Sequence, residues 1–336
     1  MKRIFFLAGF IFFLFSCQKV GVKEEIYQEN YWNLVNARPY EIVFKSENIN
    51  RGGSGVICLK RINPDIESFY LIVNENHKIN FIRYKGELFI SFIAFPLSYT
   101  NLSLSIVSKR GDIEETNFVA INTCIKGYGV RKISMSSEFG IDKGEELGEK
   151  MPEEVMKRYD RILKKFSEKT VFNVFNYTSQ NQTYRENFSF NPVKPVSGGK
   201  VTSDFGIKRN FVLKNRVVRT SFHMGIDYVN GKNFDIYSIE DGTVVFSGYN
   251  GWSGNFILID HGFGIFSAYA HCSRLLVKSG DKVRKGELIA ISGSTGYATG
   301  DHLHFSLIIN GTSVNPHEWL DREWVSKNVL PALLKE

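Results

Sequence analysis

The segment HLHFSLII, residues 302–309, constrains the fold more than any other stretch because it specifies a strand with two unlike faces. Alternate residues of a strand point to the same side of a sheet. One face is apolar and suited to packing, and it is formed by Leu303, Phe305, Leu307 and Ile309. The other face carries His302, His304 and Ser306, so two imidazoles are expected to share a cleft or a solvent-facing side of a packed sheet.

Three further potential functional groups occur upstream. FHMGIDY places His223 and Asp227 four residues apart, and YAHC supplies His271 at the end of an apolar run. A catalytic zinc ion takes about three nitrogen or oxygen ligands from the protein and keeps one position open. Five groups therefore provide a ligand set and leave two imidazoles for proton transfer and charge stabilisation. A single histidine is most often structural, but this combination favours a zinc hydrolase.

The motifs HMGID and HLH resemble the HxxxD and HxH motifs of the lysostaphin-type zinc metalloendopeptidases, also called the LytM family of peptidoglycan hydrolases. The resemblance extends to the flanking segments PVSGGKVTSDFG and VNPHEWL and covers about residues 194–320. One difference is that the usual FGxR reads FGIKR, which displaces Arg209 by one position. The resemblance implies a β-rich peptidase domain over 194–336 that hydrolyses peptide cross-links of bacterial peptidoglycan.

The resemblance also implies a role for each candidate residue. His223, Asp227 and His304 match the residues that hold Zn²⁺ in that family. His271 and His302 match the residues that activate water and stabilise the tetrahedral intermediate, with the division between them left open. The bond that is cleaved depends on loops of the groove, so these motifs leave it unspecified.

The N-terminus MKRIFFLAGFIFFLFSC resembles a bacterial lipoprotein signal. Two basic residues precede an apolar run, from Ile4 to Phe15, that is short for a membrane span. This pattern predicts a signal peptide over 1–16, a lipidated Cys17 and a tether over 17–35. The protein is then expected to be lipid-anchored to a membrane, facing the periplasm or wall; an ordinary secretion signal or an uncleaved anchor is the alternative.

Residues 36–134 contain about seven short apolar or alternating runs broken by turns, which predict an antiparallel, immunoglobulin-like β-sandwich. These runs are YEIVF, GVICLK, FYLIV, INFIRY, ELFISFIAF, LSLSIV and NFVAINT. No catalytic constellation accompanies them, so a binding, spacing or occluding role is expected. The chain as a whole is predicted to be mainly β.

The segment 135–193 is predicted to be a linker containing one amphipathic helix. MPEEVMKRYDRILKKF has Pro152 near its start, acidic residues in its first turn and lysines in its last. Its apolar residues share one face, which is expected to pack on a domain, and they are Val155, Tyr159, Ile162 and Phe166.

Charge and cysteine content narrow the compartment and partners. The 336 residues carry a formal charge of +7, a mild excess spread along the chain that favours an anionic wall polymer or a lipid surface. The chain shows no basic stripe or nucleic-acid motif, so nucleic acid is not an expected partner. If Cys17 is lipidated, three cysteines remain; Cys58 and Cys124 could form a disulfide or stay as two buried thiols, and Cys272 is expected to pack behind the site.

Three other functions were weighed against hydrolysis. A non-catalytic LytM-like regulator of another cell-wall hydrolase would be expected to lose a ligand or a catalytic histidine, and none is lost here. A lipoyl-type carrier would need an exposed lysine between Ser292 and Asp301, where there is none. A non-haem iron oxygenase would be expected to show a close H-x-D pair, which is absent. The sequence therefore predicts a zinc metalloendopeptidase.

Overall fold

A computed structural model describes most of the chain beyond the N-terminal segment. The residues it describes are 39–125, 127–134, 157, 161, 164–185, 188, 190–213 and 216–334. The predicted signal peptide, Cys17 and tether lie outside them, as does most of the predicted helix over 151–166, of which Lys157, Arg161 and residues 164–166 are described and helical. Within the described residues, no helix has the length and apolar character needed to cross a membrane.

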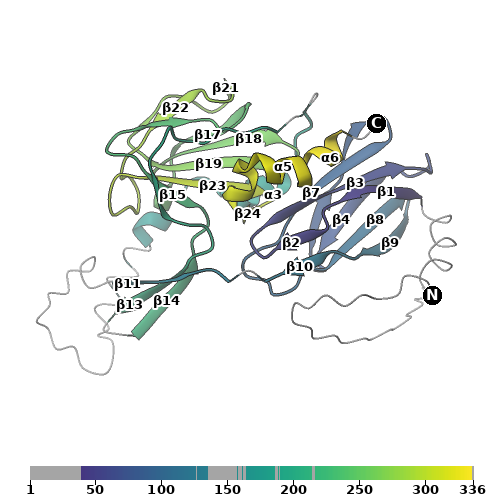
Figure 1. The fold of residues 1–336 in the computed structure, drawn as a ribbon, viewed down its shortest axis with the longest axis horizontal. Helices are drawn as coiled ribbons and strands as arrows, with labels where there is room; N and C mark the ends of the chain where they lie inside the picture. Colours follow the sequence, from purple (N-terminus) through teal and green to yellow (C-terminus); the bar gives the residue numbers. More distant parts are fainter. Residues whose placement is uncertain are drawn as a thin grey trace, which may run out of the picture. The chain divides into compact units, whose positions relative to one another are not determined.

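Two four-stranded antiparallel sheets form the first part of the chain (Figure 1). The first has the order β1 (Tyr40–Lys45), β3 (Ser54–Arg61), β7 (Leu88–Ala94), β6 (Ile82–Lys85). The second has the order β5 (His77–Asn80), β4 (Ser68–Val73), β8 (Leu104–Arg110), β9 (Ile113–Val119). In chain order these are the A-B-E-D and C′-C-F-G arrangements of an immunoglobulin-type sandwich.

One predicted run proved to be two strands. INFIRY breaks at Phe81, so that β5 belongs to one sheet and β6 to the other. The buried Phe81 lies at this crossover and donates its backbone N–H to Phe69, while both sheets contribute to one hydrophobic cluster that contains Ile57, Phe69 and Ile106. The run is apolar because Ile79 and Phe81 pack in this cluster, while Ile82 and Tyr84 pack in a second cluster that includes residues of the C-terminal part.

Three short strands follow or flank the sandwich. β2 (Asn48–Asn50) pairs in parallel with β10 (Asn122–Cys124). β11 (Val130–Ser134) leaves the sandwich and pairs in parallel with β13 (Lys208–Leu213), which forms a hairpin with β14 (Arg216–Phe222). Strands from the two ends of the linker thus join in one three-stranded sheet.

An eight-stranded antiparallel sheet forms the C-terminal part, as expected for a β-rich domain. Its order is β12 (Lys200–Ser203), β15 (Ile226–Val229), β23 (Leu303–Ile309), β19 (Ile265–Cys272), β18 (Asn255–Gly262), β17 (Gly242–Tyr249), β21 (Lys282–Val283), with β24 (Thr312–Val314) also on β23. A smaller sheet has the order β16 (Asp235–Tyr237), β22 (Leu288–Ile291), β20 (Arg274–Leu275). A short 3₁₀ turn covers Gly251–Ser253.

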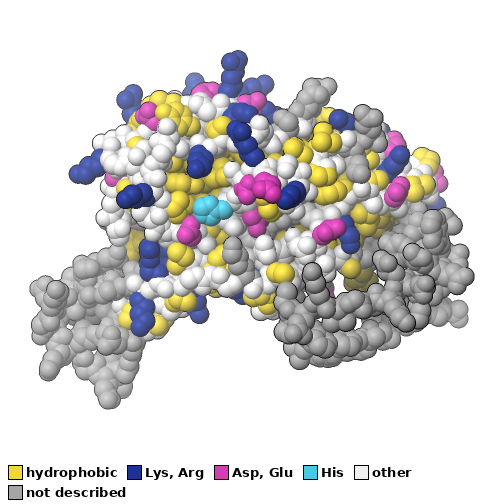
Figure 2. All heavy atoms as spheres, in the orientation of Figure 1, with side chains coloured by type: hydrophobic (Ala, Val, Ile, Leu, Met, Phe, Trp, Pro, Cys, Tyr) yellow, Lys and Arg dark blue, Asp and Glu magenta, His cyan; other side chains and the backbone are white. Residues whose placement is uncertain are grey.

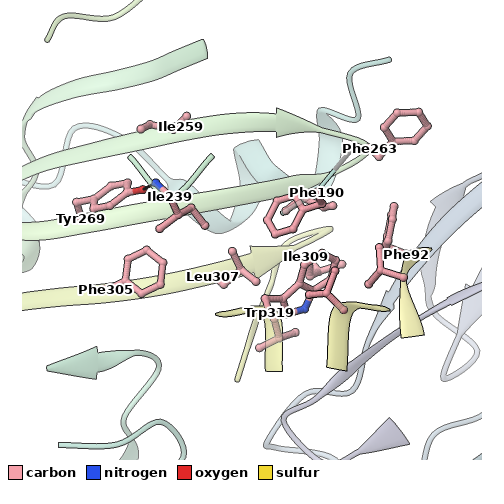
Figure 3. Packing of buried hydrophobic residues seen from close by; sticks show 14 of the residues in the cluster. Phe92, Phe190, Ile239, Ile259, Phe263, Tyr269, Phe305, Leu307, Ile309 and Trp319 are labelled. Carbon is pink, nitrogen blue, oxygen red and sulfur yellow. Dashed lines mark hydrogen bonds between the residues drawn. The ribbon is translucent and has the colours of Figure 1, made fainter. Parts of the chain in front are cut away.

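Strand β23 has the two faces that its sequence predicts. Leu303, Phe305, Leu307 and Ile309 are fully buried in the main hydrophobic cluster. Figure 3 shows Phe305 near Tyr269, Leu307 near Ile239 and Ile309 near Trp319. Because the apolar row is buried, the histidine row is held on the opposite side of the sheet.

The polar linker before the C-terminal domain contains a helix that the sequence did not predict, α3 (Val174–Gln180), capped by the Asn173 side chain. Three apolar residues near it, Phe172, Val174 and Tyr177, pack on the second face of the large sheet, and the ring of Phe172 stacks on Phe246 at 4.7 Å. This part of the linker therefore packs on the sheet although most of its residues are polar.

The sandwich and the C-terminal part share one core, and residues 39–336 form a single compact unit. Three C-terminal helices, α4 (Pro316–Leu320), α5 (Arg322–Asn328) and α6 (Leu330–Leu333), lie beside the sandwich strands (Figure 1). Trp319 packs on Phe92 of β7 and donates its indole N–H to the Ser54 hydroxyl at 2.7 Å (Figure 3). The domain boundaries predicted at residues 134 and 194 divide the sequence only. They do not separate two independently packed units, because one hydrophobic cluster contains residues from both sides.

The described cysteines form no disulfide, and Cys124 is exposed, which differs from the expected alternative of two buried thiols. Cys124 on β10 is an exposed free thiol, so no disulfide joins it to the buried Cys58 on β3. Cys272 is fully buried behind His271, where burial raises the pKa of its thiol to about 12.

Candidate metal centre

Three adjacent strands bring the predicted site residues together. Asp227 on β15 lies directly opposite His304 on β23, and Ala270 on β19 lies opposite His304 on its other side. Directly opposite residues of antiparallel strands project to the same face. His271 follows Ala270, and His223 lies just before β15, so all of these groups converge at one end of the three strands.

Three atoms form the centre of the site. Nε2 of His223 lies 2.9 Å from Oδ1 of Asp227 and 3.0 Å from Nδ1 of His304. Nδ1 of His304 lies 2.8 Å from the same carboxylate oxygen. These residues are the group of potential metal ligands found among the described residues.

In His223 and His304, one ring nitrogen faces the triangle and the other faces away from it. The nitrogens that face away have hydrogen-bond partners, and this limits how many hydrogens can lie within the triangle. Nδ1 of His223 donates to the Asp204 carbonyl at 2.8 Å, so the neutral ring has only a lone pair on Nε2. Burial lowers the pKa of His223, which favours that neutral form. At most one hydrogen, on Nδ1 of His304, is then available among the three close atoms.

A cation bound between these three atoms would satisfy their lone pairs and remove the repulsion between them. Nε2 of His304 lies 3.0 Å from the Ser306 hydroxyl, which can accept its hydrogen and free Nδ1 to bind a metal. Two imidazole nitrogens and one carboxylate oxygen are a donor set that suits zinc. The residues present therefore fit a metal ion.

The carboxylate of Asp227 divides its oxygens between two tasks. Oδ1 faces the histidines, whereas Oδ2 accepts a hydrogen bond from Nη2 of Arg209 at 2.9 Å. Burial alone would raise the pKa of this carboxyl, but the adjacent imidazoles of His223 and His304 outweigh burial and lower it. Arg209 thus reaches the ligand in spite of its displacement in FGIKR.

The glycine of HMGID permits the close approach of the strands. A Cβ on Gly225 would lie 2.4 Å from the Phe305 carbonyl oxygen and 2.8 Å from Cε1 of His304. Any side chain here would push the first motif away from the second, so glycine is required by contact rather than by turn geometry.

The remaining two histidines lie beside the ligand group. The rings of His271 and His302 have centroids 4.7 Å apart, and Nε2 of His302 is 3.9 Å from Oδ1 of Asp227. Nδ1 of His271 donates to the Thr295 carbonyl, and Nδ1 of His302 to the Gly300 carbonyl. Each ring therefore has its Nε2 left for another partner.

His271 has two further unusual properties. Its backbone is left-handed, with φ of 65°, at the end of β19, a conformation that non-glycine residues rarely adopt. Burial, followed by the nearby imidazoles of His304 and His302, lowers its pKa to about 3. A neutral imidazole is thus kept next to the ligand group, with a lone pair on Nε2.

A groove of about 490 Å³ opens over the site. One wall is formed by the loop 297–301, and the other by Thr202, Arg209, Phe211 and Arg131. The loop is held by aromatic contacts, because Tyr297 packs on Trp252 and on Phe166 from the linker. The loop 297–301 therefore holds the adjacent His302 in the groove.

Sequence reasoning placed the five site residues but missed some of their partners. Ser306 was expected to face the cleft, without its contact to His304. Arg131 was not singled out, since it lies far away in the sequence and has no motif around it. His261 lies fully buried on β18, where its ring bonds the Asp241 carbonyl and the Ser267 hydroxyl.

The fold and the site define a candidate metal centre on an antiparallel sheet. Residues 221–316 match Peptidase family M23, so the chain contains a Peptidase M23 domain. The chain is 37% identical over 116 residues to the peptidoglycan DD-endopeptidase ShyA of Vibrio cholerae, covering 34% of this chain and 26% of that protein. It is 36% identical over 132 residues to the DD-carboxypeptidase/endopeptidase Mpg of Neisseria meningitidis, covering 39% and 29%.

A solved structure is similar over a longer stretch. A crystal structure of an M23-type protein from Pseudomonas aeruginosa covers 80% of this chain and 93% of its own, at a TM-score of 0.50 and 19% identity. This similarity concerns the fold. The chain spans less than a third of the length of the two curated relatives, 26% and 29%, so their similarity concerns the peptidase domain.

Proposed function

We propose that this protein is a zinc-dependent endopeptidase that hydrolyses peptide cross-links of bacterial peptidoglycan. The observation that carries the proposal is the triangle of His223, Asp227 and His304, in which three acceptor atoms lie within 3.0 Å of one another. His271 and His302, which are not metal ligands in this proposal, lie beside the triangle and can transfer protons and stabilise charge. The groove above the triangle offers space for a peptide substrate. The relatives named as peptidoglycan endopeptidases support the substrate class.

In this proposal His223, Asp227 and His304 hold the ion, and Arg209 keeps the Asp227 carboxylate oriented. Bound zinc supplies Lewis acidity and lowers the pKa of a water ligand to about 7. His271 and His302 supply the proton transfers: one Nε2 takes a proton from the attacking water, and the proton then passes to the leaving amine as the C–N bond breaks. The other imidazole, protonated so that its Nε2 carries a hydrogen, donates that hydrogen to the carbonyl oxygen as negative charge develops on it.

Purified full-length chain, treated with chelator and then reloaded with zinc, tests the proposal. About one zinc per chain should bind, and the reloaded protein should release muropeptides from isolated sacculi that mass spectrometry can identify. The stripped protein should release none. Stoichiometric zinc without hydrolysis of any sacculus would favour a non-catalytic regulator, and iron in a metal-neutral preparation that stays inactive with zinc would reject the peptidase.

We also propose that Cys17 carries lipid and holds the enzyme on a membrane, facing the periplasm or wall. The apolar run that ends at LFSC supports this proposal. Stable anchoring takes more than one acyl chain, which a multiply acylated cysteine provides. Metabolic labelling with a fatty-acid analogue should mark the wild type and not Cys17→Ser, and equal labelling of both would reject the anchor.

A further inference from the structure

The first part of the chain supplies one wall of the groove. Strand β11 leaves the sandwich and pairs with β13 so that Arg131 lies beside Arg209 in the parallel ladder. Arg131 lines the same groove as His271, His302 and His304. The groove is therefore built from two distant segments, and the sandwich side contributes a cation to it.

The sheet that carries Arg131 is strongly basic. Its three strands VRKIS, KRNFVL and RVVRTSF contain six lysines and arginines and no acidic residue. Figure 2 shows Lys and Arg side chains, in dark blue, on the surface formed by this sheet. Such a concentration of charge attracts anionic groups toward the groove.

The two groove arginines differ in their partners. Arg209 donates to the Asp227 carboxylate at 2.9 Å. Arg131 donates through Nη2 to the Thr202 carbonyl at 3.0 Å, and among the described residues no carboxylate lies within ion-pair distance of it. A guanidinium has five N–H donors, so this single bond leaves most of them for a ligand.

The other acidic residue of the groove does not compensate Arg131. The Asp301 oxygens accept hydrogen bonds from the Ser292 hydroxyl at 2.6 Å and from the Asn233 backbone at 2.9 Å. Both oxygens are thus engaged on the opposite wall of the groove. An uncompensated guanidinium remains beside the site where a peptide would lie.

We infer that Arg131 is a specificity residue that binds a free carboxylate of the substrate peptide, on the β11 side of the scissile bond. This inference rests on the proposed peptidase function and names the substrate class more closely: cross-linked peptides with an ionised carboxyl group, in preference to the amidated forms. A guanidinium matches a carboxylate with two parallel hydrogen bonds, which a carboxamide cannot reproduce. The sandwich then acts as a fixed part of the substrate groove.

Two forms of one synthetic cross-linked peptide test the inference, with the carboxyl group nearest the scissile bond either free or converted to a carboxamide. Wild type should prefer the free carboxylate, and Arg131→Gln should raise KM for that form roughly five- to tenfold at unchanged kcat. The carboxamide form should be cleaved equally by both proteins, and Arg131→Lys should recover part of the preference. Zinc content should stay at the wild-type level.

Lys132→Gln is the matched control, because it removes one charge from the neighbouring position of the same strand, which does not line the groove. Equal losses on both peptides, a loss of zinc, or a wild type without preference would overturn the inference. If Arg131→Gln does not fold, the wild-type preference decides by itself. Calorimetric binding of both peptides to zinc-free wild type separates this question from hydrolysis, since a failed peptidase can still show or lack the preference.

Discussion

One buried histidine, His261, and the histidines of the metal centre have opposite surroundings. Both ring nitrogens of His261 have protein partners, the Asp241 carbonyl at 2.8 Å and the Ser267 hydroxyl at 2.7 Å. At the metal centre, each ring has one nitrogen fixed by an outer partner while the inner nitrogen faces other acceptors or the groove. Burial is shared by His261, His223 and His271, so the hydrogen-bond partners, and not burial, distinguish a structural histidine from a functional one.

The largest effect is expected from removing a ligand. Asp227→Ala deletes the anionic donor of the triangle and leaves two lone-pair nitrogens 3.0 Å apart. Zinc and activity should be lost together, which metal analysis and muropeptide release can measure. Asp235→Ala, an acidic residue outside the groove, is the control and should keep both. A zinc-replete Asp227→Ala protein would show that the triangle is not the metal site.

The two spare histidines should fail differently from the ligands. His271→Ala and His302→Ala should keep near-normal zinc while kcat falls roughly 10²-fold or more, because a proton carrier or an oxyanion donor acts mainly in the transition state. KM should change less than kcat. If His302→Ala sheds zinc while His304→Ala retains it, the roles within HLH are reversed.

Acid should destabilise the fold through His261, whose two ring nitrogens both have protein partners. Burial lowers the pKa of His261 from 6.5 to about 4, so the folded state binds fewer protons, and its stabilising contribution is complete above pH 6.5 and is lost as the pH falls toward 4. The free energy of unfolding of zinc-free protein should fall by about 2 kcal/mol from this residue between pH 8 and pH 5.

His261→Asn keeps a donor for the Asp241 carbonyl but has no imidazole to protonate. Its free energy of unfolding, measured with urea, should therefore fall by about 2 kcal/mol less than that of the wild type between pH 8 and pH 5. Its stability at pH 8 is expected to be lower, so the comparison is between the two slopes. An unchanged slope would mean that other groups carry the acid sensitivity.

The smallest effect is expected at the outer partner of a ligand. Ser306→Ala removes the hydroxyl 3.0 Å from Nε2 of His304 and should weaken zinc binding roughly tenfold, as second-sphere changes at metal sites do. Competition with a chelating dye measures this affinity. Ser313→Ala, a buried serine on β24, is the control and should leave zinc affinity unchanged.

Periodicity and motif spacing predicted much of this molecule. Alternation in HLHFSLII predicted both faces of β23, because a strand buried on one side must alternate. The packing of the linker segment around α3 was not predicted because most of its residues are polar. Its contacts with the sheet are made by a few apolar residues, Phe172, Val174 and Tyr177. Arg131 was missed for a different reason: its role depends on the pairing of β11 with β13, which local sequence does not encode.

The contact of Trp319 with the sandwich has a consequence for how the chain reaches its final form. Phe92 is translated more than two hundred residues before Trp319, the aromatic residue that covers it. Contacts with such long sequence separation form late and slow folding. During synthesis the sandwich must keep an apolar surface uncovered until the last helices emerge. The complete unit can therefore assemble only after the whole chain has been made, so a truncated copy would present that surface to its neighbours and tend to aggregate.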